Sequence, residues 1–170
     1  MQPAREIVQI VDEDNREIGA VSRRIMREQV LVHRAAYILV FNRAGLLFVQ
    51  KRTRTKDVYP GYYDIAAGGV VLAGESYEEA ADRELAEELG VKDVPLTACF
   101  DHYYEDRDNR VWGRVFRCVH EGPFTLQEEE IESGGFMEVS QILAPENGHL
   151  FTPDGLEILR RLFSETQARS

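Results

Sequence analysis

Residues 69–91 read GVVLAGESYEEAADRELAEELGV, and this stretch decides the fold. Its second half, Tyr77 to Leu89, predicts a helix that Gly90 closes, because glycine readily adopts the left-handed conformation of a C-terminal helix cap. Residues three and four positions apart share a face of a helix. One face carries three glutamates, and the face beside it carries an apolar stripe, Ala81, Leu85 and Leu89, that would pack on a sheet.

The three glutamates are Glu84, Glu87 and Glu88. Like charges at this spacing destabilise an isolated helix by about 0.2–0.5 kcal/mol per pair. A divalent cation would reverse that cost, since Mg²⁺ and Mn²⁺ bind carboxylate oxygens and bridge them to phosphates. For an isolated ExxEE triplet a solvated helix face is the better explanation, so the surrounding residues have to decide.

Those surroundings fit the pattern G-x5-E-x7-R-E-U-x-E-E-x-G-U, where U is aliphatic. Its fixed positions are filled by Gly69, Glu75, Arg83, Glu84, Leu85, Glu87, Glu88, Gly90 and Val91. At ordinary residue frequencies such a set of identities arises by chance on the order of once in a hundred million starting positions. This pattern is the Nudix box, and the chain resembles the Nudix hydrolases, which cleave a diphosphate linked to another moiety with the help of a divalent metal.

The resemblance implies a fold. It predicts an α/β (α+β) chain, namely a Nudix α/β/α sandwich with a central mixed β-sheet, in which the box forms a loop-helix-loop. Strands that alternate irregularly with about three helices indicate the same class independently. We expect residues 1–170 to form a single domain, with an N-terminal hairpin and short helix in 1–30 and the Nudix core in 33–167.

The resemblance also implies the metal ligands. Glu84, Glu87 and Glu88 correspond to the family's ligands for Mg²⁺ or Mn²⁺, and the backbone carbonyl of Gly68, just before the box, corresponds to a common additional ligand. Bound metal lowers the pKa of water and neutralises charge on the phosphoryl oxygens, while a carboxylate takes the proton, so that water attacks phosphorus.

Two further sets of residues have implied roles. Arg83 and Glu75 correspond to a pair that holds the carboxylates and the loop in place. Many Nudix enzymes also place one more catalytic or metal-binding glutamate on a loop before a late strand. Here the candidate is Glu130, with Glu129 or Glu132 as alternatives, and a solvated acidic loop explains these residues about as well.

The segments HRAAYILVF (33–41) and QKRTRTKDVYPGYYD (50–64) resemble type I isopentenyl-diphosphate isomerase, a Nudix-fold enzyme of different chemistry. That enzyme needs a Cys-Gly-His run where this chain has Gly68-Gly69-Val70, and one of its metal histidines falls at Met26. Hydrolysis is therefore favoured. An isomerase-like enzyme and a non-catalytic nucleotide-sensing module stay open as alternatives.

The same comparison singles out Arg52 and Lys56, which match the isomerase's diphosphate-binding loop. Both would bind substrate phosphate, Arg52 through a bidentate fork and Lys56 as a point charge. Solubilising charges on an exposed loop are the competing interpretation. His33, which falls at a second metal histidine of the isomerase, is interpreted as a structural residue at the start of a strand.

The distribution of charge along the chain limits the classes of partner that it can bind. The net charge is −10. Residues 75–88 hold seven acids and one base, residues 128–132 hold four glutamates, and the remainder is neutral. Such a chain is a poor ligand for a nucleic acid polymer, which needs a basic surface. We expect a small-molecule diphosphate substrate instead.

The remaining expectations concern location and assembly. No run of residues approaches the roughly 18 apolar positions of a membrane helix, and no apolar signal core follows the N-terminus. The chain is therefore expected to be cytoplasmic, without a membrane partner. A homodimer is common among the proteins it resembles, and no residue of the sequence decides for or against one.

Outside the box, alternation and turn residues predict the following elements: a hairpin over 6–21, a helix over 22–29, a buried hairpin formed by 35–41 and 46–50, a strand pair flanking Gly68-Gly69, antiparallel strands over 96–104 and 111–119, a strand over 136–139, and a final helix over 152–167.

Overall fold

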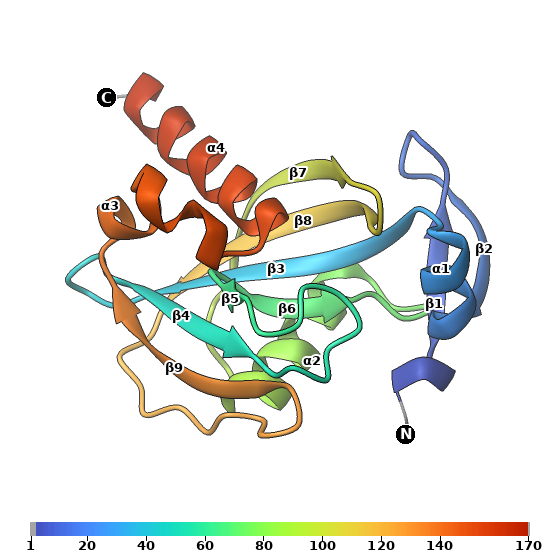
Figure 1. Ribbon diagram of the computed structural model, residues 1–170, viewed down its shortest axis with the longest axis horizontal. Helices are drawn as coiled ribbons and strands as arrows, with labels where there is room; N and C mark the ends of the chain where they lie inside the picture. Colours follow the sequence, from blue (N-terminus) through green and yellow to red (C-terminus); the bar gives the residue numbers. More distant parts are fainter. Residues whose placement is uncertain (1–2, 170) are drawn as a thin grey trace.

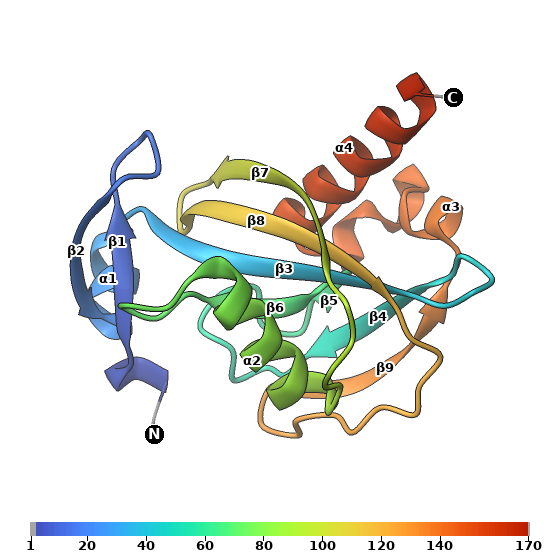
Figure 2. The ribbon, with the colours of Figure 1, turned by 180° about the vertical axis from the view of Figure 1, so that it is seen from behind.

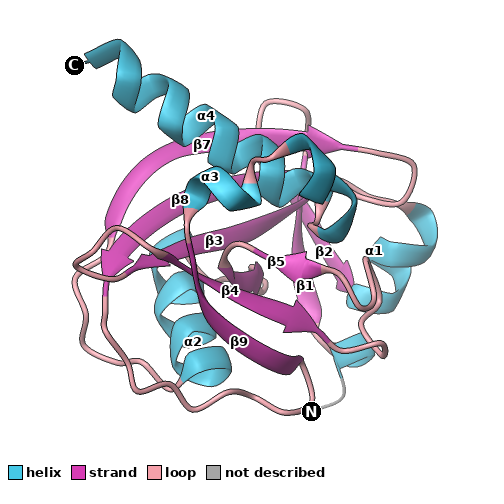
Figure 3. Cartoon of the chain, turned by 60° about the vertical axis from the view of Figure 1, so that its left-hand side comes forward, coloured by secondary structure: helices cyan, strands magenta, loops and turns pink. Residues whose placement is uncertain are grey.

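A central mixed sheet lies between helices on both of its faces in the computed structural model, which describes residues 3–169. Helix α2 (Tyr77–Leu89) covers one face, and α3 (Val139–Ile142) and α4 (Pro153–Arg169) cover the other (Figures 1 and 3). The predicted α/β/α sandwich is confirmed.

Strand β3 (His33–Phe41) is the centre of the sheet. Along its whole length it pairs in parallel with β8 (Arg110–Val119), which in turn pairs antiparallel with β7 (Thr97–Glu105). On its other side β3 pairs antiparallel with β6 (Ala67–Val70). Because parallel and antiparallel neighbours flank one strand, the sheet is mixed (Figure 2).

The predicted buried hairpin of 35–41 with 46–50 is present as a tight turn with one antiparallel register pair, but it does not continue as a ladder. Strand β4 (Leu47–Arg52) follows β3 through a tight turn, but the two share a single register pair, Phe41 with Leu47. From there β4 diverges and pairs instead with β9 (Ile131–Met137) and the short β5 (Tyr63–Asp64). β8 occupies one edge of β3 along its whole length and β6 occupies residues 35–38 of the other edge, so β4 meets β3 only at Phe41.

Two smaller predictions also need correction. Gly68 and Gly69 lie inside β6 and are not flanked by a strand pair. The late strand begins at Ile131 and ends at Met137, and Val139, predicted in that strand, begins α3. Glycines at positions 134 and 135 hide this strand, because glycine disfavours strands in sequence-based reasoning.

The N-terminal segment forms its predicted hairpin and helix at one end of the sheet (Figure 2). It comprises a short 3₁₀ turn (Pro3–Arg5), β1 (Ile7–Val11), β2 (Glu17–Ser22) and α1 (Arg23–Gln29). The Ser22 hydroxyl caps α1 by accepting from the Ile25 N–H. Met26 is 1% exposed and packs with β1, so the segment is anchored to the core by apolar contacts.

Each face of the sheet has its own apolar core. Toward α2, the predicted stripe of Ala81, Leu85 and Leu89 is at most 2% exposed and packs on β3 and β6. The core toward α4 contains the buried side chains of Leu156, Ile158, Leu159 and Leu162, together with residues of α3. A 3₁₀ turn, Pro145–Leu150, leads into α4. Within residues 3–169 no helix has the length and apolarity to span a membrane.

Candidate active site

The site begins with the way α2 is held at its two ends. At its start the Ser76 hydroxyl accepts from the Glu79 N–H at 3.0 Å, and the Glu79 carboxylate accepts from the Ser76 N–H at 3.1 Å. This reciprocal capping box satisfies two otherwise free N–H groups. At its end Gly90 adopts a φ of 67°, as predicted. With both ends fixed, the glutamate face of α2 is held against β6.

Glu88 is the most buried of the three glutamates, at 6% exposure. Its Oε1 accepts from the Gly68 N–H at 2.8 Å, and its Oε2 accepts from the Gln50 side-chain amide at 3.3 Å. Burial, together with the nearby Glu84 carboxylate, raises the pKa of Glu88 to about 8. The structure therefore places a carboxylate where its charge is poorly tolerated without a cation.

Two consecutive glycines allow β6 to lie close to α2 on one side and to β3 on the other. A Cβ on Gly69 would lie 2.8 Å from Glu84 Oε1, and a Cβ on Gly68 would lie 1.9 Å from the Ala36 carbonyl oxygen. Gly68 also has a φ of +139°, in the region that favours glycine. Gly69 thus lets the Glu84 carboxylate lie directly on β6, and Gly68 lets β6 pair closely with β3.

Arg83 gathers the carboxylates of the box. Its Nε and Nη2 donate to Glu75 at 2.7 and 2.9 Å, and its Nη1 donates to Glu84 at 2.9 Å and Glu87 at 3.3 Å. Nη2 also contacts the Val70 carbonyl at 3.3 Å. The structure thus pairs Arg83 with Glu75 as the sequence pattern implies, and it fixes Glu84 and Glu87 through the same guanidinium.

A cavity in front of this face contains all three glutamates of the triplet. Other residues that line it are Gly68, Gly69, Arg83, Lys56 and Glu130, together with residues of the N-terminal segment. Among the described residues, no three carboxylate, histidine or cysteine side chains converge into a ready-made metal cluster. The donors available here are carboxylate and carbonyl oxygens, which is the set that Mg²⁺ and Mn²⁺ prefer.

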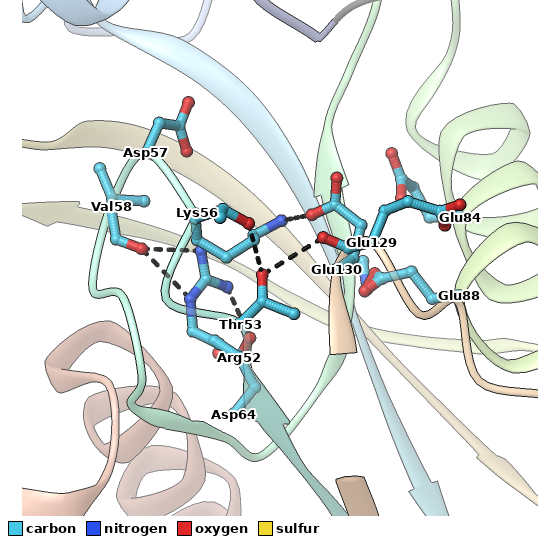
Figure 4. Close-up of polar contacts among 12 residues, drawn as sticks. Arg52, Thr53, Lys56, Asp57, Val58, Asp64, Glu84, Glu88, Glu129 and Glu130 are labelled. Carbon is cyan, nitrogen blue, oxygen red and sulfur yellow. Dashed lines mark hydrogen bonds and ion pairs between the residues drawn. The ribbon is translucent and has the colours of Figure 1, made fainter. Parts of the chain in front are cut away.

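The loop after β4 brings Lys56 to this cavity, as Figure 4 shows. Lys56 Nζ forms an ion pair with Glu130, the last residue before β9. The Thr53 N–H donates to the Glu130 carbonyl at 3.1 Å, and the Thr53 hydroxyl donates to the Glu129 carbonyl at 3.2 Å. The loop and the acidic segment 128–132, distant in sequence, therefore meet at the site.

The three candidates for the additional glutamate lie in different places in the structure. The Glu130 side chain lines the same cavity as Glu84, Glu87 and Glu88. Glu132 lies in β9 and pairs with Lys51 at 3.3 Å, outside that cavity. Glu129 contacts the loop through its backbone. Of the three residues, the structure brings Glu130 to the triplet.

Arg52 is placed differently from the expectation. Its Nη1 donates to Asp64 at 2.6 Å, and its Nε and Nη2 donate to the Val58 carbonyl at 3.2 and 2.8 Å (Figure 4). These bonds use much of the fork that a bidentate phosphate contact requires. Arg52 lines a neighbouring cavity and not the one that holds the glutamates. Lys56, in contrast, lines both.

Two residues of α1, which sequence reasoning did not single out, also line the neighbouring cavity. Arg23 and Arg27 each donate through Nε to Asp57 at 3.0 Å. Although burial opposes it, Arg27 and Arg23 hold the pKa of Asp57 well below its usual range. The basic composition of residues 23–27 was visible in the sequence, but only the position of α1 against the sheet brings these side chains to the site.

Two positions that correspond to metal ligands of the isomerase, Met26 and His33, are used structurally. Met26 is buried in the apolar cluster beneath α1. His33 is 2% exposed, its Nδ1 lies 3.1 Å from the Leu31 carbonyl, and burial lowers its pKa to about 3. His33 is thus placed as a buried, neutral residue at the start of β3, in agreement with the structural interpretation.

Comparison with known proteins adds an independent line of evidence. Residues 31–157 match the model of the NUDIX domain. The chain is 48% identical over 154 residues to a Nudix hydrolase of Yersinia pestis, covering 91% of this chain and 84% of that protein. It is 43% identical over 155 residues to a Nudix hydrolase of Pseudomonas aeruginosa, covering 91% of this chain and 92% of the relative.

Solved structures resemble the fold. A protein of Deinococcus radiodurans superposes with a TM-score of 0.80 at 23% identity, covering 92% of this chain and 98% of that one. A MutT protein of Methanosarcina mazei superposes with a TM-score of 0.70 at 23% identity, covering 79% of this chain and 95% of that one. At this level of identity the similarity speaks for the architecture alone.

Proposed function

The chain belongs to the Nudix hydrolases, enzymes that act on acid anhydrides of phosphorus, and we propose that it is a metal-dependent pyrophosphohydrolase. Its substrate is an organic diphosphate, including nucleoside-diphosphate-linked compounds, which it cleaves by attack of water at phosphorus. The observation that carries this proposal is the single cavity lined by Glu84, Glu87, Glu88, Gly68 and Lys56.

Nudix hydrolases generally use divalent metal ions, and the donors of this site fit such an ion. Glu84, Glu87, Glu88 and the Gly68 carbonyl would hold Mg²⁺ or Mn²⁺. Burial raises the pKa values of both Glu84 and Glu88, so that the protein alone does not compensate their charges. When bound, the ion supplies charge neutralisation at the phosphoryl oxygens and a lowered pKa for water.

The other residues of the site position the metal ligands and neutralise charge on the substrate. Arg83 holds the carboxylates of Glu75, Glu84 and Glu87 together through its guanidinium, which limits the motion of the metal ligands. The Lys56 ammonium, at the edge of the cavity, binds a phosphoryl oxygen of the substrate as a point charge. Glu130, its ion-pair partner, is then free to accept the proton of the attacking water.

Two alternatives remain to be separated by experiment. The isomerase-like alternative is disfavoured because Gly68-Gly69-Val70 replaces the catalytic cysteine run and Met26 is buried in the core. A non-catalytic nucleotide-sensing module would need no complete set of carboxylates, whereas this chain retains the whole box.

The decisive experiment is phosphate or nucleotide release from a panel of diphosphates in the presence of Mg²⁺ or Mn²⁺. We expect turnover by the wild type and a loss of about 100-fold or more in Glu87→Gln and Glu88→Gln. Asp82→Asn, an exposed position on the same helix, is the matched control and should retain activity. Absence of turnover combined with metal-independent binding would support the sensing module, and formation of the allylic isomer from isopentenyl diphosphate would support the isomerase.

A further inference from the structure

Four successive residues of the loop between β4 and β5 are each held by a different part of the fold. The parts are the segment before β9, helix α1, strand β4 and the connection between β7 and β8. The contacts are those of Lys56 with Glu130, Asp57 with Arg23 and Arg27, Val58 with Arg52, and Tyr59 with Asp106 (Figure 4 shows the first and third). The loop is therefore fixed from several sides at the point where it carries Lys56.

The contact with α1 is made by the Asp57 carboxylate. Arg23 donates to it through Nε at 3.0 Å and Nη2 at 3.3 Å, and Arg27 donates through Nε at 3.0 Å. The two arginine side chains are only 15% and 16% exposed, so they depend on this carboxylate for compensation of their charge. Arg27 also donates through Nη1 to Asn109 Oδ1 at 3.3 Å, which joins α1 to the connection between β7 and β8.

The contact with that connection is made by the Tyr59 hydroxyl, which donates to Asp106 Oδ2. Burial, together with the Asp106 carboxylate, raises the pKa of Tyr59, so the hydroxyl keeps its proton and donates. Asp106 is itself held by the Tyr104 hydroxyl at 2.9 Å and the Asp108 N–H at 2.8 Å. Tyr59 has a φ of 49°, a costly conformation for a residue other than glycine that persists only where the surroundings impose it.

These anchors matter most when the Lys56 ammonium leaves Glu130. In the proposed function a phosphoryl oxygen of the substrate takes the ammonium, and the contact with Glu130 then no longer restrains the loop. A lysine has a long flexible stem, so the position of its ammonium depends on how well its backbone is fixed. The restraints that remain beside Lys56 are those at residues 57–59.

We propose, on the basis of the function proposed above, that Asp57 and Tyr59 are positioning residues of this site. Through α1 and Asp106 they hold the loop so that the Lys56 ammonium reaches the substrate phosphate. They contact neither the substrate nor the metal ligands and act through Lys56 alone. Helix α1 and the connection between β7 and β8, both outside the Nudix box, therefore take part in phosphate binding.

The test is a double-mutant cycle of Tyr59→Phe with Lys56→Met, measured as kcat/KM for the best diphosphate of the panel. Phenylalanine keeps the ring and removes one hydroxyl, while Asp106 retains its two other donors. We expect Tyr59→Phe to lose at least about tenfold when Lys56 is present and less than about twofold in the Lys56→Met background. Tyr62→Phe, on the same loop and 39% exposed, is the matched control and should change little in either background.

The same cycle with Asp57→Asn tests the anchor on α1. The neutral side chain leaves two poorly exposed guanidinium groups without a countercharge, so this variant also loses stability. A loss of folded protein lowers kcat/KM by the same factor in both backgrounds, whereas a positioning effect disappears when Lys56 is replaced. Asp82→Asn is the control for the loss of one charge at an exposed position.

A second readout separates this proposal from the function beneath it. The affinity for methylenediphosphonate, whose P–C–P link is not hydrolysed, is measured by calorimetry with Mg²⁺ for the same variants, and the same pattern of losses is expected. If the wild type cleaves no diphosphate but this pattern holds for binding, the hydrolase fails and the positioning role stands. If Tyr59→Phe and Asp57→Asn lose equally in both backgrounds, or lose nothing when Lys56 is present, the positioning role is wrong whether or not the enzyme turns over. If the wild type neither cleaves a diphosphate nor binds methylenediphosphonate, both proposals fail.

Discussion

Acidification from pH 7.5 to pH 5 should destabilise the protein through one imidazole, that of His33. The ring is 2% exposed and its Nδ1 lies 3.1 Å from the Leu31 carbonyl. A carbonyl only accepts hydrogen bonds, so the neutral ring carries its proton on Nδ1. Burial, with a further contribution from Arg27, lowers the pKa of His33 from 6.5 to about 3.

The size of the effect follows from the two pKa values. Between pH 6.5 and pH 3 the unfolded chain binds a proton at this histidine and the folded chain does not. The stability that depends on the neutral ring is therefore complete above pH 6.5 and is lost as the pH falls toward 3. At pH 5 the loss amounts to about 2 kcal/mol, because each pKa unit between pH 5 and 6.5 is worth about 1.4 kcal/mol.

The assay is urea denaturation of the wild type and His33→Asn at pH 7.5 and pH 5. Asparagine can still donate to the Leu31 carbonyl but does not titrate. We expect the wild type to lose about 2 kcal/mol more than the variant between the two pH values, since groups common to both cancel. His149→Gln, which removes an exposed imidazole, is the control and should behave as the wild type does. An identical pH dependence in wild type and His33→Asn would refute the reasoning.

Three further predictions address the site. Millimolar Mg²⁺ or Mn²⁺ should raise the melting temperature, since a ligand at 100 times its Kd adds about 2.7 kcal/mol to the stability of the folded state; a Tm indifferent to metal and to EDTA would contradict a metal site. Arg83→Lys should lower kcat/KM at least about tenfold while the urea midpoint changes little, because one ammonium cannot hold three carboxylates together; unchanged steady-state kinetics would exclude the positioning role. Gly68→Ala should destabilise the protein by about 3 kcal/mol or more in urea denaturation, because its Cβ would overlap the carbonyl of Ala36. Gly135→Ala, where a Cβ meets open space, is the control. Equal urea midpoints for Gly68→Ala and Gly135→Ala would contradict this prediction.

The helix of the box could be predicted to the residue because all of its determinants are local. A cap, an apolar stripe and a closing glycine lie within the span from Ser76 to Gly90. The same holds for α1, which Ser22 caps. The triplet of glutamates could likewise be placed on one face, since the helical period alone fixes that arrangement.

The parts that the sequence does not reveal depend on distant partners. Nothing in residues 35–50 indicates that β3 pairs with β6 and β8 and leaves β4 after one register pair. Asp154 follows a threonine and a proline and has the pattern of an ordinary helix start; only the packing of α4 on β3 and β5 makes it a buried carboxylate. The commitment of Arg52 to Asp64 is similarly a consequence of the β4–β5 pairing.

The position of α1 has an evolutionary consequence. Arg23 and Arg27 precede residues 31–157, the part that matches the NUDIX domain, yet they line the cavity beside the box. The box and part of the wall of the neighbouring cavity are thus encoded in separate stretches of the chain. Substitutions in this seven-residue helix are therefore expected to change the wall of that cavity while the sequence of the box stays unchanged. Divergence or redesign of that wall can proceed through this short element while the box stays constant.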